Sequence, residues 1–515
     1  MIKSSNRNGP VVLVSEDIAY AFPFGIAYLA GYLRRQGENV QILFRPGSRT
    51  SFEPFAREII GLKPLVVGFG GLYPDLHPVR DLTGLLKDSG CTFPVVIGGQ
   101  MVSPTPEFAV RITGADMGVI GEGEIILHDL VKALRTGEDP STVAGLAIRE
   151  GDTVRLTGTG EYIHDLSELP PIPYDLFPTD KWLNFGRFYA GRAQPHWHFN
   201  DRVVSIHGGR GCPYTCNFCY HASKARYRKI SDMIAEADAM LRRYDANMLS
   251  FGDDTALASP QRASELVETL SKLGRPVEYS VSSRFDILSR IDDTLLREMK
   301  RSGCRIMGLG IESGSQRVLD VMHKGTTVDQ IVSGLRRLKE VGILPTVSIM
   351  VGQLSETLED AEESMALMLD AVRHDKHIQF AFTITTPFPG TELYEIALER
   401  GILNDHYDFF QRFSPDRQWG DVTANLSEMT DDEVRCMRQK MEMAFIRESA
   451  LMKGDAMMAV EFLRGKVADS YGFYRRMESR LGGLGGVLHR PSSVTYDLVQ
   501  SILDRVRLRL MGLDT

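Results

Sequence analysis

Short apolar runs rich in Val and Ile alternate with longer amphipathic stretches through residues 10–135. The amphipathic stretches, such as 24–35 and 79–86, carry apolar residues at helical spacing, and each lies between two of the short runs. Strands that alternate with single helices are typical of a parallel, doubly wound α/β sheet. The runs expected to form strands are 11–14, 40–43, 65–69, 95–97 and 117–120.

Glycine-rich segments follow three of these strands. Doubly wound sheets bind ligands at the carboxyl ends of their strands, and glycine lets the backbone approach a large ligand closely. We therefore expect a ligand site at this edge of the sheet. The glycines at these strand ends are Gly70, Gly71, Gly98, Gly99 and Gly121.

A second alternating series begins near residue 203 and ends near residue 401. Amphipathic helices follow most of its apolar runs, including 233–244, 295–301 and 331–341. Six strand–helix units fit an open, partial (β/α)6 barrel better than a full eight-unit barrel, which usually needs about 250 residues. The strands are expected at 203–207, 248–251, 277–281, 306–311, 346–351 and 378–385.

Two segments do not follow either series. Residues 146–149 and 154–157 indicate a β-hairpin, and the prolines at 170, 171 and 173 indicate an extended linker. Residues after 402 are helical in pattern and poor in strands. The predicted organisation is a first α/β domain at 1–140, a hairpin and Pro-rich linker at 141–200, a barrel at 201–401 and a helical region at 402–515.

Composition narrows the functional classes. The chain has 515 residues, too many for one hydrophobic core, and a net charge of −8, which argues against nucleic acid as the main partner. No apolar run reaches the ~18 residues needed to span a bilayer, and the first residues lack the apolar stretch of a secretory signal. We expect a cytoplasmic protein with no transmembrane segment.

Three of the six cysteines fall within eight residues, as Cys212, Cys216 and Cys219 directly after a predicted strand. Such clustering in a reducing compartment favours a metal site over disulfides. Three thiolates can bind one face of a [4Fe-4S] cube and leave one iron open, because such a cluster normally takes four. The alternative is a zinc site with His207 or His221 as the fourth ligand. The other cysteines are expected to be buried core residues; they are Cys91, Cys304 and Cys436.

The segment CPYTCNFC at 212–219 resembles the CxxxCxΦC signature of the radical S-adenosylmethionine (SAM) superfamily, with Phe218 at the aromatic position. The resemblance extends over about 203–400 and includes PFPGT at 387–391. It implies that the open iron binds SAM, that reductive cleavage gives a 5′-deoxyadenosyl radical, and that Phe218 packs near the adenine. One departure is GQLSET at 352–357, where related chains commonly have G-x-PGET.

The same resemblance assigns further SAM contacts at strand ends. Asp253 and Asp254 are expected at the methionine amine, Ser283 and Arg284 at the carboxylate, and Glu312 at the ribose hydroxyls. Each has an alternative structural role, because an aspartate can cap the following helix and an Arg or Glu can form a structural ion pair.

The first domain resembles the Rossmann-like cobalamin-binding module that precedes the barrel in one subgroup of this superfamily. The resemblance is carried by PFGIAYLA at 23–30, VVIGG at 95–99 and GEGE at 121–124. It implies that cobalamin is contacted by residues at the strand ends, namely Gly70, Gly71, Leu72, Gly98, Gly99, Gly121, Glu122, Gly123 and Glu124. Many cobalamin proteins place the His of a D-x-H-x-x-G motif on cobalt after the first strand. Here the loop at 15–20 has no His, and His77 lies in an incomplete motif after the third strand. We interpret His77 as a surface or helix-start residue and expect cobalt to lack a protein His ligand.

The two resemblances together imply a cobalamin-dependent radical SAM C-methyltransferase that acts on an unactivated carbon of a small-molecule substrate and takes electrons from an external flavodoxin or ferredoxin. Three alternatives are open: a radical SAM cyclase or oxidative rearrangement enzyme for a tetrapyrrole, lipid or natural product, a methylthiotransferase-like RNA modifier, and a non-catalytic cobalamin sensor. The RNA modifier usually has a three-cysteine N-terminal domain, whereas residues 1–200 contain only Cys91. Aromatic residues after the barrel could line a pocket or serve ordinary packing; they are Phe409, Phe410, Phe413 and Trp419.

Overall fold

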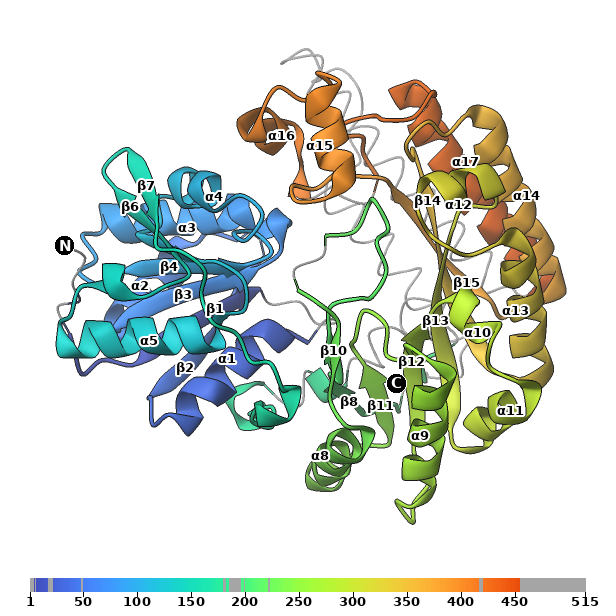
Figure 1. Cartoon of the computed structure of the whole chain (residues 1–515), viewed down its shortest axis with the longest axis horizontal. Helices are drawn as coiled ribbons and strands as arrows, with labels where there is room; N and C mark the ends of the chain where they lie inside the picture. The colour runs from blue at the N-terminus through green and yellow to red at the C-terminus, as the bar shows by residue number, and fades with distance from the viewer. Residues whose placement is uncertain are drawn as a thin grey trace, which may run out of the picture.

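Two α/β units stand side by side in the chain, and their parallel sheets are built from separate parts of the sequence (Figure 1). Among the helices that the structure describes, none has both the length and the apolar composition needed to cross a membrane. The computed structural model describes residues 4, 6–16, 22–47, 50–178, 182–184, 196–198, 200–220, 223–415 and 420–453.

The first unit is a seven-stranded sheet in the order β2-β1-β3-β4-β5-β6-β7. Its first five strands are parallel, as the alternating pattern predicts. Helices cover both faces, so the doubly wound fold class is confirmed. The strands are β1 (Val11–Glu16), β2 (Val40–Arg45), β3 (Val66–Gly71), β4 (Val95–Gly99), β5 (Met117–Val119), β6 (Leu146–Glu150) and β7 (Thr153–Leu156). The helices are α1 (Phe24–Arg35), α2 (Glu53–Gly61), α3 (Leu76–Asp88), α4 (Pro106–Thr113) and α5 (Gly123–Thr136).

The hairpin predicted within the linker extends this first sheet. β6 pairs antiparallel with β5, and β7 pairs antiparallel with β6. The backbone groups at the edge of β5 are thereby satisfied by a strand that follows residue 140. The N-terminal sheet therefore continues past residue 140, through Leu156.

The second unit is a six-stranded, all-parallel sheet in the order β15-β14-β13-β12-β11-β8. Because each strand pairs with its sequence neighbour, the sheet has the order of a partial barrel, in agreement with the six predicted units. Its strands are β8 (Val203–Ile206), β11 (Met248–Phe251), β12 (Glu278–Ser283), β13 (Cys304–Glu312), β14 (Leu344–Val351) and β15 (Gln379–Ile384), and a small ladder is formed by β9 (Gly209–Arg210) and β10 (Arg226–Tyr227).

Helices follow the strands of the barrel and bury their apolar faces against it. Two of them begin with a capping box, in which Thr327 and Thr357 accept backbone hydrogen bonds at helix starts. The helices are α8 (Ile230–Arg243), α9 (Pro260–Ser271), α10 (Phe285–Leu288), α11 (Asp293–Arg301), α12 (Gln316–Val321), α13 (Val328–Val341) and α14 (Leu358–His374).

The Pro-rich segment is packed rather than extended through solvent. Its apolar residues are buried in the same core as the barrel, and Pro170 and Pro173 lie against Gly31 of α1. This segment therefore fills the space between the two units instead of spanning it. The buried residues are Ile163, Leu166, Leu169, Ile172, Tyr174 and Phe177.

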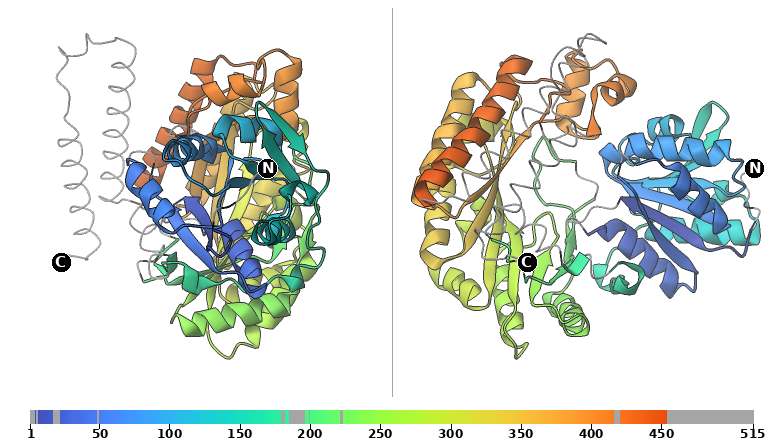
Figure 2. Two further views of the ribbon diagram at one scale, coloured as in Figure 1. Left: turned by 90° about the vertical axis from the view of Figure 1, so that its left-hand side faces the viewer. Right: turned by 180° about the vertical axis from the view of Figure 1, so that it is seen from behind.

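The helices after β15 divide between the two units. α15 (Glu392–Glu399) and α16 (His406–Arg412) bury their apolar residues in the core of the first unit, beneath α3 and α4. α17 (Asp431–Lys453) packs on α14 and β15 along the outside of the barrel (Figure 2). The helical prediction for 402–515 holds for α16 and α17, and its remainder from 454 onward lies outside the described residues.

Candidate active site

The loop that carries Cys212, Cys216 and Cys219 leaves the barrel after β8 and is closed at its base by the antiparallel β9–β10 ladder. Gly211 starts this loop with φ +71°, and a Cβ added there would lie 2.4 Å from the carbonyl oxygen of Ser223. A side chain is therefore excluded where the chain turns from β9 into the first cysteine.

Polar donors lie beside two of the cysteine sulfurs. The Cys212 sulfur is 3.6 Å from the Thr255 hydroxyl, and the Cys216 sulfur is 3.6 Å from Nη1 of Arg284. Cys216 is buried and Cys219 is exposed. Both groups can donate hydrogen bonds to sulfur. This environment fits the predicted cluster ligands.

The zinc alternative fits less well. A tetrahedral zinc ion with Zn–S bonds of about 2.3 Å would hold its sulfurs about 3.8 Å apart. Within the described chain, the three cysteine sulfurs do not come within 4.8 Å of one another as a group. His207 is buried with its ring 4.9 Å from the Phe24 ring, and His221 lies outside the described residues. The described residues therefore do not present a ready tetrahedral zinc site around these cysteines.

Asp253 presents an unused acceptor at the end of β11. Its Oδ1 accepts a hydrogen bond of 2.8 Å from the Gly208 backbone N–H, whereas its buried Oδ2 has no partner in the part of the chain that the structure describes. Burial raises the pKa of Asp253, which a bound cation would lower again. The following helix is capped by Ser259, so Asp253 is not needed as its cap. Asp254 is exposed. A free carboxylate oxygen fits the predicted role toward an ammonium group.

Ser283 and Arg284 follow β12 and differ in what they contact. The Ser283 hydroxyl donates a hydrogen bond of 3.1 Å to the Leu257 carbonyl oxygen, so this side chain has a structural role. Arg284 donates a hydrogen bond of 2.8 Å from its Nε to Asp286 Oδ1, and its guanidinium lies 3.5 Å from the centre of the Tyr214 ring. Arg284 is therefore held by a structural ion pair, and it also reaches the Cys216 sulfur.

Glu312 ends β13 in a strained conformation. Its φ is +64°, and the pairing with β14 shifts by one residue there. The buried carboxylate accepts hydrogen bonds of 3.0 Å from both Lys324 and Ser348. Lys324 Nζ also lies 5.8 Å from the centre of the Phe218 ring. A strained, fully bonded carboxylate beside the cluster loop indicates a constrained functional position.

The carboxyl edge of the first sheet faces the cluster loop. Tyr220, directly after Cys219, places its hydroxyl beside Ser103 in the loop after β4. A Cβ at Gly390, in the PFPGT turn, would lie 2.7 Å from the Tyr220 ring and 2.9 Å from Pro104. Three segments distant in sequence therefore meet at this point: the cluster loop, the first unit and the turn after β15.

Exposed backbone and one exposed leucine line this edge. Leu72 is 56% exposed, and Gly99 and Gly121 are exposed. A Cβ at Gly121 would meet no atom within 4 Å, so the space in front of it is open. Ser103 connects the loops after β4 and β5, because its hydroxyl oxygen accepts a hydrogen bond of 2.9 Å from the Gly121 backbone N–H. An open edge of this kind fits a large flat cofactor.

Other predicted contacts at this edge have packing roles. Gly70, Gly98 and Gly123 leave room for neighbouring side chains of the same domain. A Cβ on any of them would lie 2.7–3.6 Å from such a side chain. Gly71 lies against the Asp75 side chain, which accepts a hydrogen bond of 2.9 Å from the Leu72 backbone N–H. These four glycines shape the edge without facing open space.

Glu122 and Glu124 are engaged differently from the sequence prediction. Their carboxylates bind arginines of the β9–β10 ladder: Glu122 pairs with Arg210 at 2.5 Å and with Arg226, and Glu124 pairs with Arg210 at 2.5 Å. The partners lie about 90 residues away in the chain, so no local pattern signals the contact.

His77 lies near the start of α3, as predicted, but it is covered. Its ring stacks on Phe410 of α16 with centroids 3.9 Å apart. Burial lowers its pKa. Phe409, Phe410 and Phe413 are buried in the same core, so they serve packing between α16 and the first unit; Trp419 lies outside the described residues.

Of the other cysteines, Cys304 is fully buried and Cys91 is half-buried, but Cys436 is exposed, so its core prediction was wrong. Cys436 lies on α17, and helical spacing there does not show which face is covered. Residues near the cluster that the sequence did not single out are Thr255, Tyr214, Tyr220 and Lys324.

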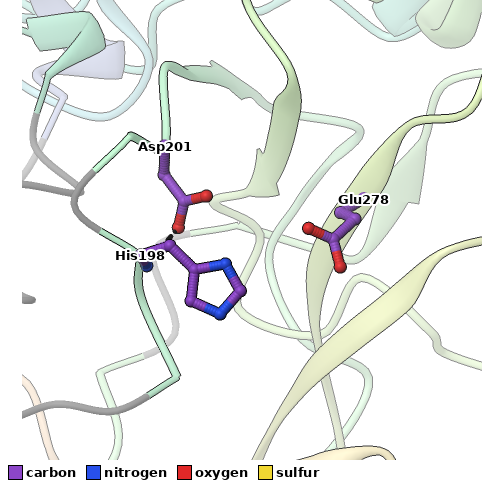
Figure 3. A group of neighbouring side chains, drawn as sticks. All are labelled: His198, Asp201 and Glu278. Atoms are coloured by element: carbon purple, nitrogen blue, oxygen red, sulfur yellow. Dashed lines mark hydrogen bonds between the residues drawn. The ribbon is translucent and has the colours of Figure 1, made fainter.

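One further group of possible metal ligands lies at the opposite ends of the strands. His198, Asp201 and Glu278 bring their ligand atoms within 4.8 Å of one another (Figure 3). Arg305 already pairs with all three, at 3.0 Å from His198 and 2.6 Å from Glu278. A guanidinium therefore already occupies the ligand atoms of this group.

Comparisons with known proteins agree with this geometry. A family model described as the radical SAM superfamily matches residues 206–368, and one described as the B12 binding domain matches residues 11–131. An uncharacterized methyltransferase of Pyrococcus horikoshii is 30% identical over 389 residues, covering 74% of this chain and 79% of that protein. The anaerobic magnesium-protoporphyrin IX monomethyl ester cyclase of Rubrivivax gelatinosus is 26% identical, covering 75% and 68%.

A solved structure supports the fold. The radical S-adenosylmethionine methyltransferase TsrM of Kitasatospora setae, with cobalamin and a [4Fe-4S] cluster bound, superposes with a TM-score of 0.59 at 20% identity, covering 76% of this chain and 74% of that one. The two family models cover the two sheets in the order that the structure gives them. The chain belongs to the radical SAM enzymes that carry an N-terminal B12-binding domain.

Proposed function

We propose that this chain is a cobalamin-dependent radical SAM C-methyltransferase that methylates an unactivated carbon of a small-molecule substrate. The observation that carries the proposal is the contact between the cluster loop and the ligand-binding edge of the first sheet. Tyr220, one residue after Cys219, touches both Ser103 and the turn at Gly390. A radical source and a methyl carrier must lie close together for one substrate carbon to reach both.

The residues at the barrel end suit a bound SAM. When bound, the cluster supplies reductive cleavage of SAM, and cobalamin supplies a carrier for the methyl group. Cys212, Cys216 and Cys219 would hold the cluster. The free Oδ2 of Asp253 would accept the methionine ammonium, and Arg284 would face the carboxylate.

The protein's own contribution is positioning and exclusion of water. Lys324 and Ser348 fix the Glu312 carboxylate in one orientation, so it can receive ribose hydroxyls without rearranging. Phe218 lies between the barrel core and the core of the first unit, where an apolar ring excludes water. The methyltransferase name of the Pyrococcus horikoshii relative supports the same assignment.

The test is product stoichiometry with the anaerobic holoenzyme. A methyltransferase uses one SAM for 5′-deoxyadenosine and a second SAM as methyl donor, which leaves S-adenosylhomocysteine. Both products should form in roughly equal amounts with a product heavier by about 14 Da, since each cofactor acts once per turnover. Formation of 5′-deoxyadenosine and product without matching S-adenosylhomocysteine would exclude methyl transfer.

A radical cyclase is the second candidate, because the Rubrivivax gelatinosus relative is named as a magnesium-protoporphyrin ester cyclase. Such an enzyme would give the second product pattern, with no gain of a methyl mass. Incubation with a magnesium-protoporphyrin monomethyl ester distinguishes the two: a cyclised product supports the cyclase, and an unchanged porphyrin excludes this substrate class.

A further inference from the structure

An ion-pair network joins the two units beside the cluster loop. It consists of Arg210 and Arg226 on the β9–β10 ladder and Glu122 and Glu124 at the start of α5. These are the ion pairs between the first sheet unit and the barrel among the residues that the structure describes. We call the four side chains the interdomain clamp.

The clamp resolves a local conflict in the ladder. Arg210 and Arg226 are direct partners across β9 and β10, and like charges placed opposite each other destabilise a pair of strands. Glu122 lies between them and binds one guanidinium with each oxygen. The ladder that closes the cluster loop therefore depends on a carboxylate from the other unit.

Burial makes the network rigid. The side chains are 5–14% exposed, and the two positive and two negative charges balance. The guanidinium of Arg210 forks between two carboxylates, and it also lies 5.5 Å from the centre of the Tyr28 ring on α1. Arg226 lies 4.8 Å from the centre of the Tyr162 ring. A buried, forked Arg–carboxylate contact fixes geometry more tightly than an exposed pair.

We propose that Arg210 is a positioning residue: through Glu122 and Glu124 it fixes the cobalamin-binding edge at a set distance from the cluster. Arg210 is two residues before Cys212, and Glu122 directly follows Gly121 at the open edge, so the clamp joins the cluster loop to this edge through residues next to both sites. This inference rests on the proposed function, because a fixed separation matters only if both cofactors act in one turnover.

The test measures the distance between the cluster and cobalamin directly. The anaerobic holoenzyme is reduced until cluster and cobalamin each carry an unpaired electron, and pulsed EPR gives the distance distribution between them. The variant is Arg210→Gln combined with Glu124→Gln, which removes one charge of each sign and leaves the Arg226–Glu122 pair intact. Its distribution should broaden and shift, while iron and cobalamin contents stay at wild-type values.

The matched control is Arg34→Gln. Arg34 forms an ion pair with Asp175 at a similar distance of 2.8 Å, but both side chains are more than 40% exposed. This variant should keep the wild-type distribution. If the double variant loses both cofactors, Arg210→Lys takes its place, since it keeps the charge but cannot fork between two carboxylates. It should also broaden the distribution.

An unchanged distance distribution in the variant that retains both cofactors would overturn the clamp. Selective loss of cobalamin with the cluster intact would also overturn it, because it would assign Glu124 to the cofactor itself. Release of S-adenosylhomocysteine by wild-type holoenzyme with reduced cobalamin tests methyl donation separately. Failure of that reaction alone would exclude the proposed function and leave the measured clamp geometry standing.

Discussion

Replacing Glu356 by Gln should stabilise the protein at pH 8 and change its stability little at pH 5. Glu356 is fully buried after β14. Its Oε2 accepts hydrogen bonds of 2.6 and 3.0 Å from the backbone N–H groups of Gly352 and Gln353, and its Oε1 has no partner among the described residues. Burial raises the pKa of Glu356 to about 7, although the two backbone hydrogen bonds oppose the rise.

The sign and size of the expected change in stability follow from the protonation state of Glu356 in the folded and unfolded protein. Because the folded protein binds this proton more tightly than the unfolded chain, the contribution to stability is complete below pH 4.5 and is lost as pH rises toward about 7. At 1.36 kcal/mol per pH unit over that interval, the loss is about 3 kcal/mol. A glutamine stays neutral throughout and keeps an oxygen for both backbone donors, so it avoids the loss.

The assay is denaturant unfolding of the anaerobic holoenzyme at pH 5 and pH 8. The change in unfolding free energy between the two pH values is compared between the variant and the wild type, so that the other titrating groups cancel. Asp408→Asn is the control. Hydrogen bonds from the Asn404 backbone N–H and from Arg412 hold the pKa of Asp408 below its usual range. That contribution is present above the unfolded pKa and is lost only at more acid pH, so Asp408→Asn should have the same effect on stability at both values. Equal pH dependence in wild type and Glu356→Gln would show that the folded protein keeps Glu356 ionised, and would refute the reasoning.

Three further predictions concern the cofactors. Alanine at any of the proposed cluster ligands Cys212, Cys216 and Cys219 should abolish bound iron and 5′-deoxyadenosine formation. Alanine at the control cysteines Cys91, Cys304 and Cys436 should leave iron content unchanged. His77→Ala should leave the cobalamin absorbance spectrum unchanged while lowering the thermal midpoint, because the ring packs on Phe410; a spectral change at the lower face of cobalt would contradict this. Arg284→Ala should reduce 5′-deoxyadenosine formation about ten- to hundredfold with iron retained, as expected for loss of a charge-assisted hydrogen bond, and an unchanged SAM affinity would contradict it.

Much of the fold could be predicted because its strands are marked locally. The apolar run expected at 346–351 lies within β14, and the helix expected at 24–35 has the bounds of α1. Regular alternation of β-type runs with helical spacing is produced by burial on both sheet faces, and such patterns do not depend on distant residues. The cysteine spacing is equally local, so the cluster loop could be recognised from eight residues.

The remaining features depend on distant partners. Glu122 and Glu124 follow a glycine at the strand end, and this position suggested cofactor contacts. In the structure their carboxylates form ion pairs with an arginine of the barrel. The prolines at 170, 171 and 173 indicated an extended linker, and they gave no sign that neighbours such as Leu169 and Ile172 are buried against the barrel. Neither outcome is encoded in a short window, because each depends on which surface the tertiary fold brings near.

The placement of α15 and α16 has a consequence for synthesis of the chain. The helical face of the first sheet that includes Leu76 and Phe108 is completed by Phe409 and Phe413, which emerge from the ribosome about 250 residues after β7. At 5–20 residues per second, this apolar face stays uncovered for roughly 10–50 s. We therefore expect synonymous codons that slow elongation between β7 and α16 to lower the yield of folded protein, because they prolong the exposure of this apolar face.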